Sequence, residues 1–122
     1  RGDVVDEMKK WGVWVANELN LDGFRLDAIK HINNNFIEEF LKEVRESRGE
    51  NFYAVGEYWK GDLESIVEYL DNVNYQADLF DVPLHFNFFT ASKNLSAHPM
   101  LVHHRLASLS VVLHYAYQRP PS

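Results

Sequence analysis

Two short apolar stretches, each followed by an acidic residue, constrain the fold of this chain most. The first, residues 23–28, carries Arg25 and Asp27 on alternate positions, and the second, residues 52–57, ends in Glu57. Because strand side chains alternate between faces, we expect Arg25 and Asp27 to point the same way. A strand, a helix and a strand within roughly 30 residues form one βαβ unit. The sequence therefore predicts parallel neighbouring strands in an α/β fold.

Asp27 and Glu57 would then lie at equivalent heights on strands about 4.8 Å apart. Their carboxyl groups are expected to approach to about 5–6 Å, the separation found in retaining glycosidases. In that reaction an ionised carboxylate attacks the anomeric carbon, and a protonated carboxyl gives its proton to the leaving oxygen. Arg25 favours the charged form of Asp27, whereas rings at Tyr58 and Trp59 that exclude water favour protonated Glu57. The pattern predicts glycosidic chemistry.

Helix and strand patterns alternate through residue 93. The predicted order is a helix over Val4–Asn20, a strand over Phe24–Ala28, a helix over Phe36–Ser47, a strand over Phe52–Glu57, a helix between Asp62 and Asn72, a strand over Leu79–Leu84 and a helix over His85–Lys93. Asp3 is expected to cap the first helix, a residue among Asn33 to Asn35 the second, and Asp62 the third. The second helix carries an apolar stripe of Phe36, Ile37, Phe40, Leu41 and Val44. Pro83 is expected to end its strand, and the helical spacing of Trp11 and Trp14 places them in the core.

Length and charge exclude several classes of protein. A closed (β/α)₈ barrel needs about 200–250 residues, and this chain has 122. Residues 1–81 hold all 18 acids against nine Lys and Arg, so a nucleic acid is not the expected partner. No apolar run approaches the ~18 residues of a membrane span, and no signal-like segment opens the chain. We expect a piece of a longer protein, and the absence of cysteine leaves its compartment open.

Two motifs, GFRLDAIKH at residues 23–31 and GEYW at residues 56–59, resemble the α-amylase family of glycoside hydrolases, in its bacterial liquefying form. The resemblance runs from Asp3 through FDVPLHFNFFTASK at residues 80–93. It implies a partial (β/α)₈ barrel, about strands 4 to 6 with their flanking helices. It also implies hydrolysis of internal α-1,4 bonds in starch, other α-1,4-glucans or maltooligosaccharides by a retaining double displacement.

The resemblance assigns roles to individual residues. Asp27 matches the catalytic nucleophile, Glu57 the general acid/base, and Arg25 the cation that hydrogen-bonds the nucleophile. Four further residues match or adjoin substrate-binding positions: Lys30, His31, Tyr58 and Trp59. The His31 backbone carbonyl matches a calcium ligand. Calcium binding is expected to be weak, because a tight site takes about six to eight oxygens.

Three family features have no counterpart in this sequence: a strand ending in Asn-His, a calcium-binding excursion before Asp3, and an FVDNHD strand that carries a third catalytic acid. The family resemblance also fails after Lys93. We therefore divide the chain into a partial barrel over residues 1–93 and a divergent tail over residues 94–122, with one further strand expected over Leu106–Tyr117. Activity is expected to be weakened by this truncation.

Other interpretations remain open. Without the resemblance, an acid at a strand end is more often a helix cap or a surface ion pair. Asp27, His31 and Glu57 are also residue types that chelate a divalent metal. A non-catalytic alternative is a fragment that self-associates and binds glucan weakly through Tyr58 and Trp59. Whether or not the chain is catalytic, the unpaired strand edges of a partial barrel predict a homo-oligomer.

Overall fold

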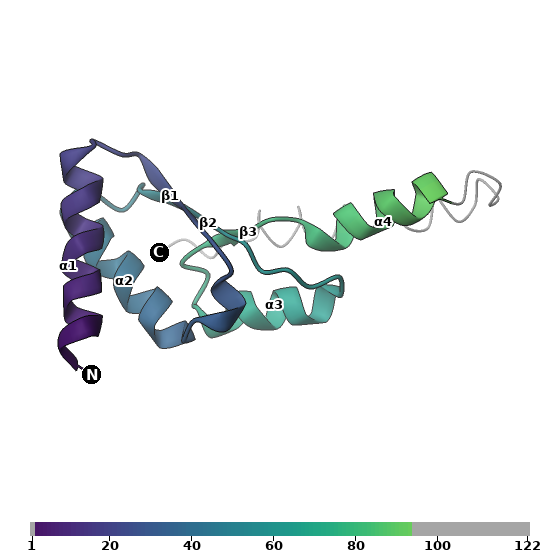
Figure 1. Cartoon of the computed structure of the whole chain (residues 1–122), viewed down its shortest axis with the longest axis horizontal. Coiled ribbons are helices and arrows are strands. Elements are labelled where there is room, and N and C mark those ends of the chain that lie inside the picture. Colours follow the sequence, from purple (N-terminus) through teal and green to yellow (C-terminus); the bar gives the residue numbers. More distant parts are fainter. Residues whose placement is uncertain (1, 94–122) are drawn as a thin grey trace.

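The computed structural model describes residues 2–93, which form a three-stranded parallel sheet with helices around it. The elements in order are α1 (Gly2–Glu18), β1 (Gly23–Leu26), the 3₁₀ turn η1 (Ile29–His31), α2 (Asn34–Arg48), β2 (Tyr53–Gly56), α3 (Leu63–Asn72), β3 (Asp78–Leu79) and α4 (Val82–Lys93). Helices α1 and α2 lie together at one end, and α4 projects away from the sheet at the other (Figure 1). No helix in this part of the chain is long and apolar enough to cross a membrane.

The sheet has the order β1-β2-β3 and confirms the predicted parallel pairing. Gly23 pairs with Tyr53 and Leu26 pairs with Gly56 at the two ends of the β1–β2 ladder. Helix α2 connects β1 to β2, and α3 connects β2 to β3. This register brings the carboxyl ends of β1 and β2 to the same height, and it therefore fixes where the next residues of both strands lie.

The core forms around the apolar stripe that was predicted on α2. Ile37, Phe40, Leu41 and Val44 are all buried in it. Gly12 lets α1 approach closely, because an added Cβ atom would lie 2.3 Å from the Phe40 ring. On the same interface the Lys9 side chain, only 11% exposed, forms ion pairs with Glu39 at 2.6 Å and Glu43 at 3.3 Å. The Lys9 ammonium group, which is largely shielded from water, is thus paired with two carboxylates.

Two predicted helix caps are confirmed. The Asn33 side chain accepts a hydrogen bond from the Phe36 amide at 3.2 Å, and Asp62 accepts one from the Ser65 amide at 2.8 Å. These side chains satisfy amides that the first turn of a helix leaves unpaired. The predicted cap at Asp3 is wrong, because α1 begins at Gly2 and Asp3 lies inside it.

The last strand and helix also differ from the prediction. Strand β3 is only Asp78–Leu79, and α4 already begins at Val82. Pro83 lies in the first turn of α4, where its fixed φ suits a helix and its missing amide hydrogen breaks no bond. The Asp81 carboxylate accepts a hydrogen bond from the Leu84 amide at 2.9 Å, as a helix cap does.

Trp11 and Trp14 are not core residues in this structure, because their side chains are 52% and 58% exposed. Helix α1 buries the side that carries Lys9, Gly12 and Ala16, and the two indoles lie on a different side. Helical spacing alone did not show which side of α1 packs on α2. The strand expected over Leu106–Tyr117 and the division at residue 94 lie outside the described residues.

Candidate functional site

Asp27 and Glu57 lie next to each other because each directly follows a strand of the β1–β2 pair. The paired residues Leu26 and Gly56 end the ladder, and the two acids come immediately after them. Backbone hydrogen bonds continue past the ladder: the Glu57 amide donates to the Leu26 carbonyl at 2.8 Å, and the Ile29 amide donates to the Glu57 carbonyl at 3.1 Å. The backbone on both sides of Glu57 is thereby attached to the segment that carries Asp27.

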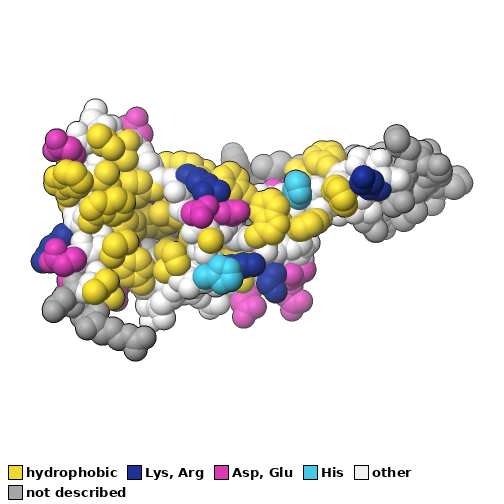
Figure 2. Space-filling model, viewed as in Figure 1, with side chains coloured by type: hydrophobic (Ala, Val, Ile, Leu, Met, Phe, Trp, Pro, Cys, Tyr) yellow, Lys and Arg dark blue, Asp and Glu magenta, His cyan; other side chains and the backbone are white. Residues whose placement is uncertain are grey.

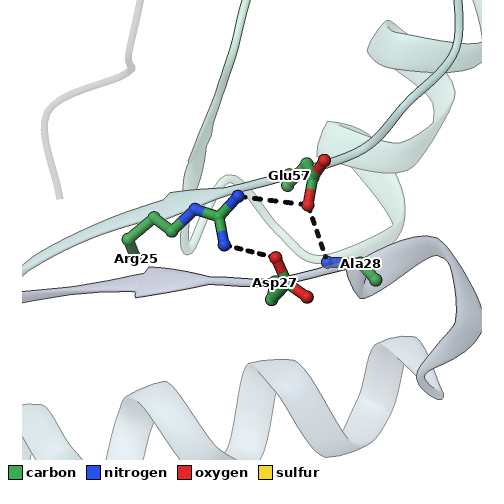
Figure 3. Close-up of polar contacts among 4 residues, drawn as sticks. All are labelled: Arg25, Asp27, Ala28 and Glu57. Atoms are coloured by element: carbon green, nitrogen blue, oxygen red, sulfur yellow. Dashed lines mark hydrogen bonds and ion pairs between the residues drawn. The ribbon is translucent and has the colours of Figure 1, made fainter.

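Arg25 bridges both acids. Its Nη1 atom forms an ion pair and hydrogen bond with Asp27 Oδ1, and its Nη2 atom lies 3.2 Å from Glu57 Oε2. Figure 3 shows the guanidinium between the two carboxyl groups. The sequence predicted the contact with Asp27 but not the one with Glu57. The guanidinium carbon also lies 6.0 Å from the centre of the ring of Phe80, which directly follows β3 and is a cation–π neighbour of the site.

Ala28 contributes a backbone donor that the sequence did not indicate. Its φ of 48° and ψ of 37° place it in the left-handed region, which is uncommon for alanine. In this conformation its amide donates to Glu57 Oε2 across 3.4 Å. The same oxygen therefore receives hydrogen bonds from both Arg25 and Ala28. An Asn or Gly at position 28 would have signalled the turn, whereas alanine gives no such signal.

The two carboxyl groups have different surroundings. The Asp27 side chain is 72% exposed and the Glu57 side chain 25%. The hydrogen bond from Arg25 lowers the pKa of Asp27 most, and a hydrogen bond from the Glu57 carboxyl lowers this pKa further. The arrangement therefore places an ionised, exposed Asp27 beside a less exposed Glu57, with Arg25 in contact with both.

The lowered pKa of Asp27 makes a prediction about acid stability. Ionised Asp27 stabilises the fold above the ordinary aspartate pKa of about 3.9, and this contribution is lost as the pH falls through the lowered folded-state value. We expect wild type to be more stable than Asp27→Asn at pH 6, and the difference to vanish in strong acid. Urea unfolding of both proteins, from pH 6 down to strong acid, measures this difference in the free energy of unfolding. A difference that does not change with pH would contradict the assignment.

Two aromatic residues, Tyr58 and Trp59, directly follow Glu57 in the sequence. Trp59 is 46% exposed, and its ring centre is 5.3 Å from that of His85 and 6.2 Å from that of Phe86. Trp59 was expected at this position, whereas the two α4 residues were not assigned to the site. Tyr58 instead stacks on buried Tyr69 of α3 at 4.6 Å, so one face of its ring is occupied by protein.

Lys30 and His31 lie in the exposed turn η1, just after the Ala28 bend. In residues 2–93 no ion pair joins either residue to Asp27 or Glu57. The same part of the chain contains no group of three His, Asp or Glu side chains arranged to hold a metal ion. Asp27, His31 and Glu57 are thus not arranged as a set of metal ligands in the described part of the chain.

Comparisons with known proteins agree with this geometry. No family model matches the chain. A glucan 1,4-alpha-maltohexaosidase of Bacillus sp. (strain 707) is 49% identical over 92 residues, which are 75% of this chain and 18% of that protein. An alpha-amylase of Bacillus licheniformis is 50% identical over 90 residues, with 74% and 18% covered. A crystal structure of an alpha-amylase from Geobacillus thermoleovorans complexed with acarbose matches with a TM-score of 0.64 and 31% identity, covering 71% of this chain and 19% of that one. This chain thus spans about a fifth of the length of these relatives.

Proposed function

Because this chain is a fragment of an α-amylase-family barrel, we propose that it hydrolyses internal α-1,4-glucosidic bonds of starch-type glucans by a retaining double displacement. The observation that carries the proposal is the pair of acids at adjacent strand ends, Asp27 and Glu57, with Arg25 between them. Two carboxyl groups with different protonation are the minimum that this reaction needs.

Each acid has one task in each half of the reaction. Asp27 attacks the anomeric carbon and forms the covalent glycosyl bond, while Glu57 gives its proton to the departing glycosidic oxygen. In the second half Glu57 takes a proton from water, and the resulting hydroxide displaces Asp27 from the sugar. Arg25 holds the free Asp27 carboxyl ionised before it attacks the sugar.

A glucan chain would lie over the exposed ring of Trp59, because sugar CH groups pack well on aromatic faces. Lys30 and His31, on the exposed turn after Ala28, are placed to hydrogen-bond sugar hydroxyls. Tyr58 contributes less than Trp59, since its ring packs on Tyr69. The substrate is therefore proposed to be an α-1,4-glucan or maltooligosaccharide.

The rate is expected to be low. An oxocarbenium-like transition state draws several kcal/mol from groups that hold and distort the sugar, and the third acid implied by the resemblance is absent from this sequence. Losing about 3–4 kcal/mol costs roughly 10²–10³ in rate. Reducing-sugar release from soluble starch, with ¹H NMR of the new anomeric centre, tests the proposal. We expect slow release of the α-anomer. Initial release of the β-anomer would exclude a retaining mechanism, and no release would favour the non-catalytic alternative.

Calcium is proposed to bind weakly at most. The only ligand implied by the resemblance is the His31 carbonyl, and a tight calcium site takes about six to eight oxygens. Within the described residues no acidic cluster supplies the rest. We therefore expect the melting temperature to remain unchanged when a chelator is added to purified protein. A fall of several degrees that calcium reverses would contradict this proposal.

We also propose that the chain forms a homo-oligomer through α1. Exposed hydrophobic side chains gather over this helix, as Figure 2 shows. They are Val4, Val5, Met8, Trp11 and Trp14 on α1, and Leu19 directly after it. Strand β1 pairs only with β2 in the described part of the chain, so its other edge is open as well. An apolar helix face next to an open strand edge is complementary to a second copy of itself.

Light scattering and tryptophan fluorescence measure this association. We expect the molar mass to rise with protein concentration and the emission to shift to the blue as Trp11 and Trp14 are buried. Trp11→Gln with Trp14→Gln is expected to reduce both effects. Trp59→Gln, which removes a tryptophan away from α1, serves as the control for association. A monomer at all concentrations would exclude the proposed oligomer.

A further inference from the structure

The contact between Gly56 and Ile29 lies directly behind the two acids. Gly56 is the last residue of β2, and Ile29 begins the turn η1 two residues after Asp27. Ile29 is completely buried. A Cβ atom added to Gly56 would lie 2.1 Å from Ile29 Cδ1 and 3.2 Å from Leu79 Cδ2. The isoleucine side chain therefore occupies the space that any other residue at position 56 would need.

The backbone around this contact holds Glu57 by three hydrogen bonds. The Glu57 amide and carbonyl bond to Leu26 and Ile29, at 2.8 and 3.1 Å. The Glu57 side chain accepts from the Ala28 amide at 3.4 Å. All three partners belong to residues 26–29, the segment that also contains Asp27. A change in the spacing between Gly56 and Ile29 must therefore move Glu57 relative to Asp27.

We propose that Gly56 and Ile29 are positioning residues, which set how the Glu57 carboxyl is presented to Asp27 by fitting one side chain into the space left by the other. Neither residue touches substrate. Their importance for catalysis rests on the proposed glycosidase function. Their effect on the positions of Asp27 and Glu57 does not depend on that function. The lowered pKa of Asp27, which depends in part on a hydrogen bond from Glu57, reports this placement without any turnover.

Three variants test the proposal by moving a single methyl group. Gly56→Ala adds the clashing carbon. Gly56→Ala combined with Ile29→Val removes Cδ1, so that the number of carbons in the pair is unchanged. Gly12→Ala is the matched control, because its Cβ atom would lie 2.3 Å from the Phe40 ring in the α1–α2 interface, away from the acids. The Asp27 pKa is followed by carboxyl ¹³C NMR, and starch hydrolysis is measured in parallel.

We expect Gly56→Ala to raise the pKa of Asp27 toward its ordinary value and to lower kcat by about tenfold or more, with a smaller effect on KM. The double variant should restore most of the lowering of the Asp27 pKa and most of kcat. Gly12→Ala should lower the melting temperature and leave the Asp27 pKa unchanged. If Gly56→Ala does not fold, the double variant must fold with the wild-type pKa.

Several results would overturn the proposal. These are an unchanged Asp27 pKa in Gly56→Ala, an equal change in Gly12→Ala, or a double variant that fails to restore the pKa or to fold. A wild-type protein without starch hydrolysis would instead remove the proposed function and leave the positioning result standing, because the NMR titration needs no substrate.

Discussion

Asp27→Asn and Glu57→Gln are each expected to reduce α-1,4-glucan hydrolysis to background, a loss of about 10³-fold or more where the wild-type rate allows it to be measured. Asp27→Asn removes the nucleophile, and an amide does not form the covalent glycosyl bond. Glu57→Gln removes the proton that the leaving oxygen needs. Both changes keep the shape of the side chain, so a loss of activity reports chemistry and not packing.

The same strands supply matched controls. Asp22 and Glu50 are exposed acids that precede β1 and β2, at the opposite ends from the site. Asp22→Asn and Glu50→Gln are expected to keep the wild-type rate of reducing-sugar release. Turnover that survives Glu57→Gln would mean that the acid lies elsewhere or that the activity is a contaminant, and the assigned roles would have to be withdrawn.

Leu41→Ala is expected to cost about 2–5 kcal/mol of folding free energy. Leu41 is completely buried on α2, within the stripe that faces α1 and the sheet. Its truncation leaves a cavity in addition to the lost transfer energy. Urea unfolding measures the change.

Leu19→Ala is the matched control, because Leu19, directly after α1, is 63% exposed and its truncation leaves no cavity. We expect a change within about 0.5 kcal/mol when both proteins are measured at low concentration. Equal losses in the two variants would show that α2 does not form the core.

The parallel unit was predictable because its determinants are local. The polar residues Asn33 and Asp62 determine where two helices begin. Apolar residues spaced three and four positions apart determine the buried face of α2. The alternation of Arg25 and Asp27 correctly predicted their contact. These features follow from which residue occupies each position, with little dependence on distant parts of the chain.

The missed features depend on three-dimensional context. Sequence did not show that Ala28 adopts a left-handed conformation, because the surrounding hydrogen bonds and not its own preference hold it there. It did not show that Arg25 reaches Glu57, since this requires the exact register of β1 and β2. Pro83 was misplaced because proline suits both a strand end and a first helical turn.

All the groups that orient the two acids belong to one contiguous stretch. Arg25, Ala28 and Ile29 contact Glu57 across only 28 to 32 positions of sequence. A single loop closure of this length brings them together, and its entropic cost grows only slowly with loop length. Such local topology favours rapid formation during folding. All the partners of these hydrogen bonds are thus present in the chain once residues 25–57 have been synthesised.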